Sequence, residues 1–223
     1  MFKVTTVVFT ILIVFLTACT QEKKRELKTK TTVVISESKP LIDKDTLIVD
    51  CNYSFDSAVS GSNAPQKIID QLQLLDVQYY SIDKKLHQGQ ILTNKLLAND
   101  ISELFKYILE IHFPIAKAIP IVKYNWNDNL SMQDNNTYSF CYRNISYSKH
   151  ATGMAIDINP YFNPLRWKND SIPRPNKPNG ATYDTSVQGT FYPNHPVILK
   201  SKSLGFRWGH YFRKKFDDHH FEK

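Results

Sequence analysis

The pattern of hydrophobic and polar positions divides the chain into three parts. Residues 4–18 are apolar apart from a few threonines. As a helix they would span only ~22 Å, less than the ~30 Å hydrocarbon core of a bilayer. Residues 20–40 are charged and polar with little periodicity, which is typical of a flexible tether. Residues 41–50 could add one strand, and the folded domain is expected to begin near Asn63, so that residues 19–62 precede a domain over 63–223.

The first part of this domain predicts a helix and then a hairpin. Apolar residues keep helical spacing from Ile68 to Leu75, and Pro65 suits a first helical turn. Segments 77–82 and 90–94 have the composition of strands, and the polar loop expected between them contains Gly89.

A second amphipathic helix is predicted over residues 101–109. Asp100 and Glu103 resemble a capping box, and Pro114 follows the predicted end. One face of this helix is apolar: Ile101, Leu104, Phe105, Ile108 and Leu109.

The remainder predicts short strands at 118–123, 154–158 and 219–222. Segment 159–196 holds seven of the eleven prolines and is expected to be a long loop, which in a compact domain is usually functional. Helices followed by short strands predict an α+β fold with a small, mainly antiparallel sheet and helices packed on it.

The N-terminus predicts export. Met1–Lys3 is short and basic, the apolar run follows, and "LTAC" from Leu16 to Cys19 resembles a bacterial lipobox. Residues 1–18 are therefore expected to be a lipoprotein signal peptide, with Cys19 lipidated and the protein anchored on the exported side of a membrane in the bacterial cell envelope. An ordinary secretory signal that contains a cysteine is the alternative.

The net charge of the chain limits the chemical class of partner that it is expected to bind. The formal net charge is +7, and removing residues 1–18, whose only charged residue is one lysine, leaves +6. A basic balance favours anionic partners such as nucleic acid, membrane surfaces or acidic cell-wall polymers. Export and the absence of a Lys/Arg-rich helix argue against nucleic acid.

Two further cysteines, Cys51 and Cys141, would be exported with the domain. An oxidising compartment permits a disulfide between them. Two free, buried thiols are an equally open alternative, because the sequence does not give the Cα separation that a bridge requires.

The segment "SKHATGMAIDINP" places His150 and Asp157 seven positions apart. On a helix they would be separated by ~10 Å along the axis, and on one strand by ~23 Å. Two ligands of one metal ion lie closer than either spacing, so the chain must fold back between them, and Gly153 can make that bend. Asp157 lies amid apolar residues and needs a partner, which a metal ion or an arginine would supply.

The C-terminal segment "GFRWGHYFRKKFDDHHFEK" adds a second constellation, Asp217 three residues before His220. A His–Asp pair with a distant His makes three protein ligands, the number that a catalytic zinc uses. A further carboxylate close by suits a general base.

These two motifs, S-x-H-x-x-G-x-A-x-D over Ser148–Asp157 and D-x-x-H-F over Asp217–Phe221, resemble the VanY-like D-alanyl-D-alanine carboxypeptidase and L-alanyl-D-glutamate endopeptidase group of zinc metallopeptidases. The similarity extends back to about residue 64. The resemblance implies zinc in a cleft, bound by His150, Asp157 and His220. It further implies that Asp217 is the general base, and Ser148 is expected to brace the His150 loop.

Other residues near these motifs carry expectations of their own. In relatives the stretch before the last motif often reads Trp-Gly-Gly-x-Trp, whereas His210 here replaces a glycine and leaves the shape of the cleft open. Trp208 and Tyr211 either line a substrate groove or pack. His219 would point away from the site if it lay in a strand. His87, His112 and His195 are expected to be surface or core residues.

The resemblance also places Arg143 near the cleft. An arginine presents a planar fork that can hold a carboxylate of the substrate, and an ion pair with Asp134 or Asp157 is the structural alternative. Together these features predict a monomeric, lipid-anchored zinc peptidase that hydrolyses peptidoglycan stem peptides, as a D,D-carboxypeptidase or an L,D-endopeptidase. A non-catalytic cell-wall-binding module on the same fold is the alternative function.

Overall fold

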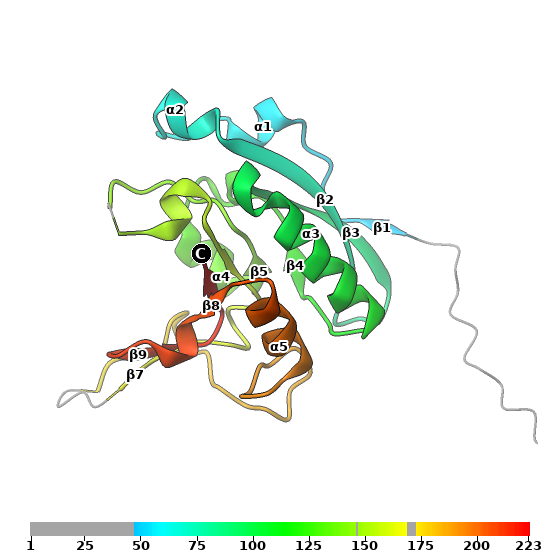
Figure 1. The fold of residues 1–223 in the computed structure, drawn as a ribbon, viewed down its shortest axis with the longest axis vertical. Coiled ribbons are helices and arrows are strands. Elements are labelled where there is room, and N and C mark those ends of the chain that lie inside the picture. The colour runs from blue at the N-terminus through cyan, green and yellow to red at the C-terminus, as the bar shows by residue number, and fades with distance from the viewer. Residues whose placement is uncertain (1–46, 146, 169–172) are drawn as a thin grey trace, which may run out of the picture. The chain divides into compact units, whose positions relative to one another are not determined.

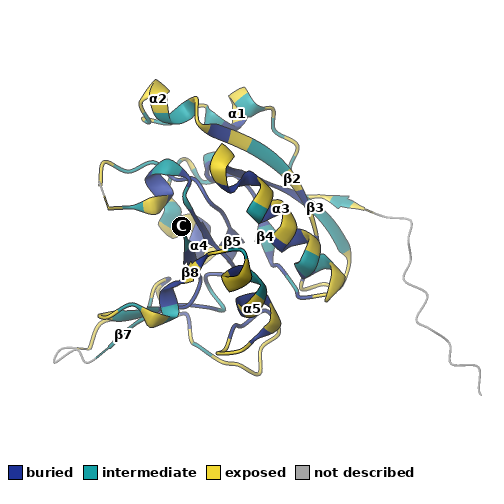
Figure 2. Ribbon diagram, in the orientation of Figure 1, coloured by how far each residue is buried: buried dark blue, intermediate teal, exposed yellow. Residues whose placement is uncertain are grey.

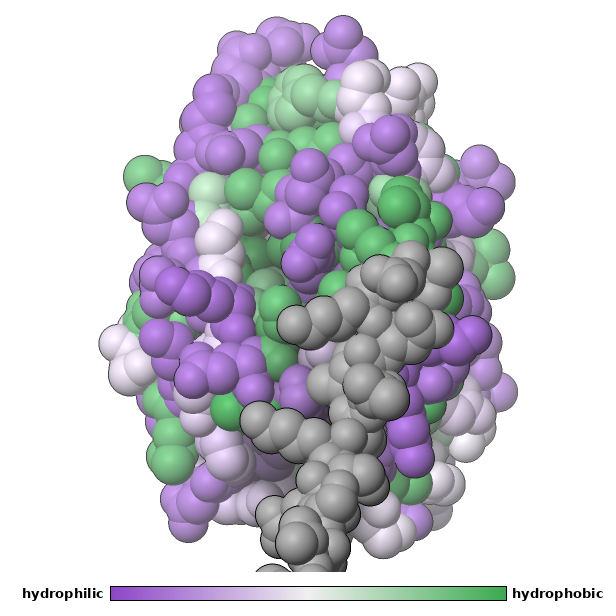
Figure 3. Space-filling view, turned by 90° about the vertical axis from the view of Figure 1, so that its right-hand side faces the viewer, coloured by the Kyte–Doolittle hydropathy of each residue, from purple (hydrophilic) through white to green (hydrophobic). Residues whose placement is uncertain are grey.

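The computed structural model describes residues 47–145, 147–168 and 173–223, which belong to one compact unit, Ile42–Lys223 (Figure 1). The predicted signal peptide and Cys19 lie outside the described residues. Within them, helices combine with small and mostly antiparallel sheets, which confirms the α+β expectation. This part of the chain contains no helix that is long and apolar enough to cross a membrane. Hydrophilic residues are spread among hydrophobic ones over the face seen in Figure 3.

A long antiparallel hairpin of β2 (Leu72–Tyr80) and β3 (Leu86–Asn94) begins the main sheet. The predicted helix is wrong beyond α2 (Gln66–Ile69), because residues 72–80 pair with β3 at nine successive positions. Each pair adds backbone hydrogen bonds and cross-strand contacts, and together they override a short run of helical spacing.

Residues ahead of Asn63 also contact this hairpin. β1 (Ile48–Val49) pairs with the edge of β3 in parallel, and it lies within the segment where a strand was expected. α1 (Phe55–Val59) follows, with the Ser54 side chain accepting a hydrogen bond from the backbone of Ser57 at its start.

Gly89 lies inside β3, opposite Val77, and the prediction that it lies in the hairpin loop is wrong. A Cβ at this position would be 2.2 Å from the carbonyl oxygen of Ala118 in β4 (Lys117–Ala118), which packs against β3. Close approach of another backbone is thus the reason for a glycine within a strand.

The longest helix, α3 (Lys95–Glu110), packs along the hairpin (Figure 1). It starts earlier than predicted, because the Asn94 side chain caps it by accepting a hydrogen bond from Leu96 N at 3.0 Å. The predicted capping box is therefore wrong, and Asp100 instead accepts a hydrogen bond from Lys223 Nζ at 2.6 Å. Figure 2 shows the buried side of α3 facing inward and its other side exposed. The buried residues are Leu97, Ala98, Ile101, Leu104, Phe105 and Ile108.

The C-terminal half is built of short elements. In chain order they are η1 (Ile121–Tyr124), α4 (Asp128–Gln133), β5 (Asn136–Thr137), η2 (Lys149–Thr152), β6 (Ala155–Asp157), β7 (Leu165–Trp167), α5 (Pro196–Ser203), β8 (Arg207–Trp208), η3 (Gly209–Tyr211), β9 (Lys215–Asp217) and β10 (His220–Glu222). The strands predicted at 154–158 and 219–222 are confirmed as β6 and β10. The strand predicted at 118–123 is largely wrong, because only Ala118 belongs to β4 and η1 follows Pro120.

Three small sheets hold these strands together. β10 lies between β6 and β8, antiparallel to both, while β9 pairs with β7, and β4 pairs in parallel with β5. The strand β7 interrupts the long loop that was expected over 159–196. The turn between β9 and β10 is only two residues long. Residue 217 ends β9 in one sheet, and residue 220 begins β10 in another sheet.

One apolar core lies under both halves. Ile156 of β6 and Phe221 of β10 belong to the same buried cluster as the inner face of α3. Burial of each such side chain stabilises the fold by ~1.5–3 kcal/mol. The strands that carry Asp157 and His220 therefore rest on a packed support.

Cys51 and Cys141 are both free thiols. Cys51 Sγ faces the Ala118 carbonyl oxygen at 3.9 Å, whereas Cys141 Sγ faces that of Trp126 at 3.8 Å. Of the two alternatives left open by the sequence, the structure contains the free thiols, of which Cys141 is buried and Cys51 is half-buried.

Candidate metal centre and catalytic cleft

His150 is delivered by a tight bend. It lies in η2, which ends at Gly153 with a φ of +69°. A Cβ on Gly153 would be 2.7 Å from Asn94 N, so a side chain is excluded by space as well as by conformation. The bend leads directly into β6 and brings Asp157 back beside His150, as the sequence predicted.

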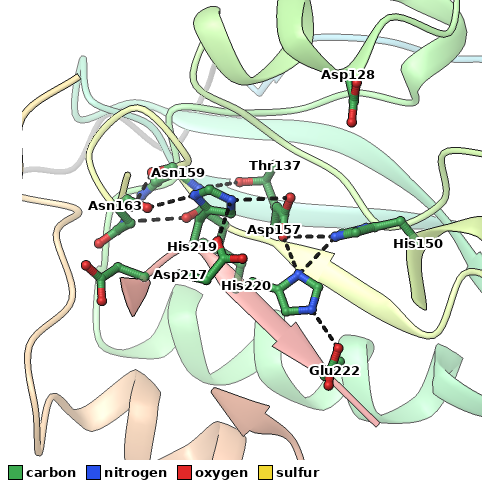
Figure 4. Close-up of polar contacts among 12 residues, drawn as sticks. Asp128, Thr137, His150, Asp157, Asn159, Asn163, Asp217, His219, His220 and Glu222 are labelled. Atoms are coloured by element: carbon green, nitrogen blue, oxygen red, sulfur yellow. Dashed lines mark hydrogen bonds and ion pairs between the residues drawn. The ribbon is translucent and has the colours of Figure 1, made fainter. Parts of the chain in front are cut away.

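Strand register supplies the third residue. His220 pairs with Asp157 in the antiparallel ladder of β10 and β6. The His220 Nδ1 and His150 Nε2 atoms lie 3.0 and 3.1 Å from Asp157 Oδ1, and 3.0 Å from each other. Figure 4 shows the three side chains converging, while Asp128 stands apart.

Hydrogen bonds on the far sides of both rings fix which nitrogen faces inward. His150 Nδ1 lies 2.7 Å from the Ser139 carbonyl oxygen, which can only accept, so this nitrogen carries the proton. His220 Nε2 lies 2.9 Å from Glu222 Oε2, and this carboxylate holds the proton on that nitrogen. The inward nitrogens therefore present lone pairs, beside a carboxylate oxygen.

The electrostatics of this cluster call for a cation. Burial would raise the pKa of Asp157, but the facing imidazoles of His150 and His219 hold it well below its usual range. Burial alone would lower the pKa of His220, yet Asp157 and Glu222 raise it to about 10. Hydrogen bonding to His220 and Arg207 lowers the pKa of Glu222 to about 2. Two lone pairs and a buried anion at one point are satisfied by a proton or a metal ion.

The donor set fits a metal ion. Two imidazole nitrogens and one carboxylate oxygen all lie within 4.8 Å of one another, and all three residues are buried. Donors of a tetrahedral zinc ion, each at ~2.0–2.1 Å from it, stand about 3.3 Å apart, close to the spacings found here. Three protein ligands leave a fourth position open, which is the arrangement of a catalytic site rather than a structural one.

A cleft of about 950 Å³ reaches this cluster, and Asp217 lines the same cleft. Asp217 is buried, and its Oδ2 lies 2.7 Å from Lys215 Nζ. Its Oδ1 accepts no hydrogen bond from the described residues, although His219 Nε2 lies 3.0 Å away in poorer alignment.

His219 faces the site. It was expected to point away only if it lay in a strand, and β10 begins one residue later. It occupies the turn between β9 and β10, where strand alternation does not apply. Its Nε2 is 3.0 Å from Asp217 Oδ1 and 3.7 Å from Asp157 Oδ2 (Figure 4). The sequence held one usable signal, since "DDHH" is too polar to continue a half-buried strand.

Arg143 also lines the cleft. Its Nη1 lies 3.0 Å from Asp128 Oδ2, so the ion-pair partner is neither Asp134 nor Asp157. The buried Nη2 atom has no hydrogen-bond partner among the described residues. One arm of the guanidinium is thus held by the protein, and the other is unsatisfied.

Residues 207, 208 and 211–213 form one wall of the cleft, and His210, where the resemblance led us to expect a glycine, lies within this segment. The His210 Nδ1 atom lies 2.6 Å from the buried Asp218 carboxylate, and its ring stacks on Trp208 at 4.5 Å. Arg166 holds the other oxygen of Asp218 at 2.6 Å. The larger side chain therefore has a structural role, in the support of the turn that holds His219 and precedes His220.

The two aromatic residues of this wall for which a role was left open, Trp208 and Tyr211, differ in their exposure to the cleft. Trp208 lines the cleft but is almost fully buried, and its Nε1 donates to the Asp218 carbonyl oxygen at 2.8 Å. Tyr211 is 59% exposed on the cleft. Packing is thus the role of Trp208, and Tyr211 is the one available to a ligand.

Ser148 precedes η2 and lines the cleft, but its side chain makes no cap hydrogen bond to that helix. The Ser148 carbonyl oxygen instead accepts from Ala151 N at 3.1 Å. The Ser139 carbonyl and Glu222, which the sequence did not single out, are the groups that orient the two histidines.

The remaining histidines lie away from the cleft. His87 contacts Asp50 at 2.9 Å and Asp83 at 3.2 Å, and His112 is exposed at the end of α3. His195 is buried between Phe113 and Phe191, and its Nδ1 accepts from Val197 N at the start of α5.

Comparison with known proteins agrees with this geometry. Residues 143–223 match the model of a family described as D-alanyl-D-alanine carboxypeptidase. The match begins at Arg143, later than the residue 64 from which the resemblance was expected, and it contains the whole cluster. No curated protein and no solved structure matches the chain. The C-terminal part of this chain, residues 143–223, thus carries the sequence pattern of the D-alanyl-D-alanine carboxypeptidase family, which confirms the resemblance to the VanY-like group.

Proposed function

We propose that this protein is a zinc-dependent peptidase that hydrolyses peptide bonds in peptidoglycan stem peptides. The observation that carries the proposal is the convergence of His150, Asp157 and His220 on one point of a cleft that Asp217 also lines. The family match over residues 143–223 supports this class of reaction and substrate.

His150, Asp157 and His220 would hold the ion. When bound, zinc would supply Lewis acidity and lower the pKa of water to about 7. The donor atoms are pre-oriented, because Ser139 and Glu222 fix the two rings and the strand ladder fixes Asp157.

Asp217 is the residue placed to move protons. Its carboxylate would accept a proton from the attacking water and pass it to the nitrogen of the leaving amine, while the water oxygen bonds to the carbonyl carbon. Lys215 holds one of its oxygens, which leaves the other for this transfer.

Arg143 is proposed to bind a carboxylate of the substrate. Its Nη2 is buried without a hydrogen bond among the described residues, so a ligand carboxylate would satisfy it. Stem peptides carry such groups, and a fixed carboxylate would hold the scissile bond at the cluster.

Lipid anchoring in the bacterial cell envelope is part of the same proposal. It rests on the "LTAC" segment, which would place the domain next to its substrate through acyl chains on Cys19. Replacement Cys19→Ser is expected to shift the protein from the membrane fraction to the soluble fraction, or to leave an unprocessed precursor. Mature protein that remains equally membrane-bound would contradict the anchor.

The deciding experiment is digestion of purified muropeptides by the protein, read by mass spectrometry. Loss of a terminal alanine indicates a carboxypeptidase, whereas two peptide fragments indicate an endopeptidase. Products should disappear after chelation and return with zinc. Binding to peptidoglycan without any product would support the alternative of a cell-wall-binding module.

A further inference from the structure

Tyr138 is buried beside the candidate metal centre, and packing accounts for the position of its ring. It is only 2% exposed and belongs to a hydrophobic cluster whose other buried members are Ile121, Met132 and Cys141. The centroid of its ring lies 5.2 Å from that of His150, with the two planes tilted by 31°. A phenylalanine would fill the same space, so these contacts leave the hydroxyl unexplained.

The hydroxyl of Tyr138 lacks the hydrogen bond that a buried tyrosine usually makes. Tyr79, the other buried tyrosine of the described residues, donates to Asp50 and accepts from Ala118 N at 3.1 Å. The Tyr138 hydroxyl has no such partner in the part of the chain that the structure describes. Because Tyr138 lines the cleft, a ligand there can supply the missing partner.

Backbone pairing places this side chain beside the metal ligands. Tyr138 and Asp157 exchange two backbone hydrogen bonds, at 3.1 and 2.8 Å, in an antiparallel bridge. His220 pairs with Asp157 along the other edge of β6. Residues directly opposite each other project their side chains from the same face, so the three side chains stand in one row. A tyrosine is longer than an aspartate, and its hydroxyl therefore extends further from the sheet than the Asp157 carboxylate.

Tyr138 and Asp217 flank the cluster on different sides. Asp217 and His150 lie on opposite sides of Asp157 in Figure 4, and the ring of Tyr138 is next to that of His150. When water adds to a carbonyl group, the carbon carries two oxygens that stand apart. A base on one side and a hydrogen-bond donor on the other can each contact one of them.

We propose that the Tyr138 hydroxyl donates a hydrogen bond to the oxygen of the scissile carbonyl. As the water oxygen bonds to the carbonyl carbon, the π electrons of the carbonyl move onto this oxygen, and a fixed donor stabilises the negative charge there. The phenol keeps its own proton, so this role needs no additional acid or base. The inference rests on the proposed function and adds a residue ahead of the segment 143–223 that matches the family.

Removal of the hydroxyl alone tests this role. Tyr138→Phe keeps the ring, so the melting temperature and zinc content should equal those of the wild type. Turnover of muropeptides should fall in kcat by about tenfold or more with little change in KM, because the hydrogen bond strengthens as charge develops. Tyr192→Phe is the matched control, since Tyr192 is exposed and does not line the cleft, and its kcat should be that of the wild type.

Peptides with free and with amidated carboxylates separate this role from that of Arg143. A donor to the scissile carbonyl serves both peptides, so Tyr138→Phe should lose kcat/KM by the same factor on each. A loss confined to the peptide with free carboxylates would place the hydroxyl in the carboxylate site of Arg143 and overturn the inference. A wild-type kcat in Tyr138→Phe would also overturn it.

Binding of a phosphinate analogue of the scissile bond tests the inference apart from turnover. The analogue has the tetrahedral shape of the addition product, so Tyr138→Phe should bind it about tenfold more weakly than the wild type does. Binding of the product peptide should not change, and calorimetry measures both. Equal affinity of the two proteins for the analogue would refute the role of Tyr138 alone. Wild-type protein that neither turns over muropeptides nor binds the analogue would refute the proposed function, and this role with it.

Discussion

His220 and Asp157 lie directly opposite each other in the antiparallel ladder of β10 and β6, with Nδ1 3.0 Å from Oδ1. Strand pairing therefore brings together two residues that are 63 positions apart. A slip of one residue would turn the side chains of β10 to opposite faces and send Phe221 into the site. The packing of Phe221 in the core protects this register.

The proposed metal centre leads to a prediction about zinc content when one of its three ligands is removed. Purified protein should hold about one zinc ion per chain, and His220→Ala should lose most of it. Removal of zinc should also lower the melting temperature, because an ion that binds the native state stabilises it. His112→Asn is the matched control, since His112 is exposed and distant and asparagine tolerates its φ of +53°. Equal zinc in wild type and His220→Ala, measured by elemental analysis, would refute the assignment.

Replacement of Glu222 is expected to weaken the binding of the same ion without abolishing it. It fixes the proton on His220 Nε2 at 2.9 Å, so Glu222→Ala should weaken zinc affinity about 10- to 100-fold while the three ligands remain. Competition with a chelator of known affinity measures this change. Arg207→Gln, which removes only the exposed partner of Glu222, should have a much smaller effect. If the two variants bound zinc equally well, Glu222 would have no part in orienting the ligand.

Asp217 and Asp218 are adjacent in the chain, but their replacement is expected to have different effects. Replacement of Asp217 should affect turnover, and replacement of Asp218 should affect stability. Asp217→Asn should keep zinc and fold, and lose at least about 100-fold in kcat, because general-base catalysis typically contributes ~10²–10⁴-fold. Asp218 is fully buried between Arg166 and His210, so Asp218→Asn should destabilise the protein by about 2 kcal/mol. Turnover numbers and urea unfolding of both variants decide the matter. A harmless Asp217→Asn beside an inactive but stable Asp218→Asn would reverse the two roles.

Replacement of Arg143 is expected to affect the turnover of substrates with free carboxylates more than that of amidated substrates. Lysine cannot reproduce the planar fork, so Arg143→Lys should lower kcat/KM on stem peptides with free carboxylates by about tenfold, and much less on amidated analogues. Its zinc content should not change. Kinetics on the matched pair of peptides provide the test. Equal losses on both, or a large fall in melting temperature, would show that the ion pair with Asp128 is the whole role of Arg143.

Burial of His195 is expected to make the stability of the protein depend on pH. Burial lowers its pKa to about 4, below the ordinary value of 6.5, so the unfolded chain binds the proton more readily than the folded one. Its neutral form contributes stability above pH 6.5, and that contribution, about 3 kcal/mol at most, is lost as pH falls from 6.5 toward 4.

The variant His195→Asn isolates this contribution, because asparagine can cap α5 but does not titrate. Urea unfolding of metal-free protein at pH 7 and pH 4.5 should show a smaller loss of stability in the variant than in the wild type. The same loss in both proteins would assign the pH dependence to other groups.

The sequence by itself determined which residues are candidates for the centre. The two motifs and the family that they resemble point to His150, Asp157, Asp217 and His220, and the need for a bend points to Gly153, because donor atoms and backbone freedom are local properties. Strands β6 and β10 were also predictable, since alternation along a half-buried strand is local as well.

Only the tertiary structure decided what depends on neighbours distant in the chain. Residues 72–75 are strand because β3 pairs with them, and Gly89 is required because the backbone of Ala118 in β4 packs against it. Glu222 and the Ser139 carbonyl orient His220 and His150 from positions that no motif marks. His219 faces Asp217 because a two-residue turn between two sheets sets its direction. Such contacts join residues far apart in the chain, and the packing of the whole domain determines their geometry rather than any local preference.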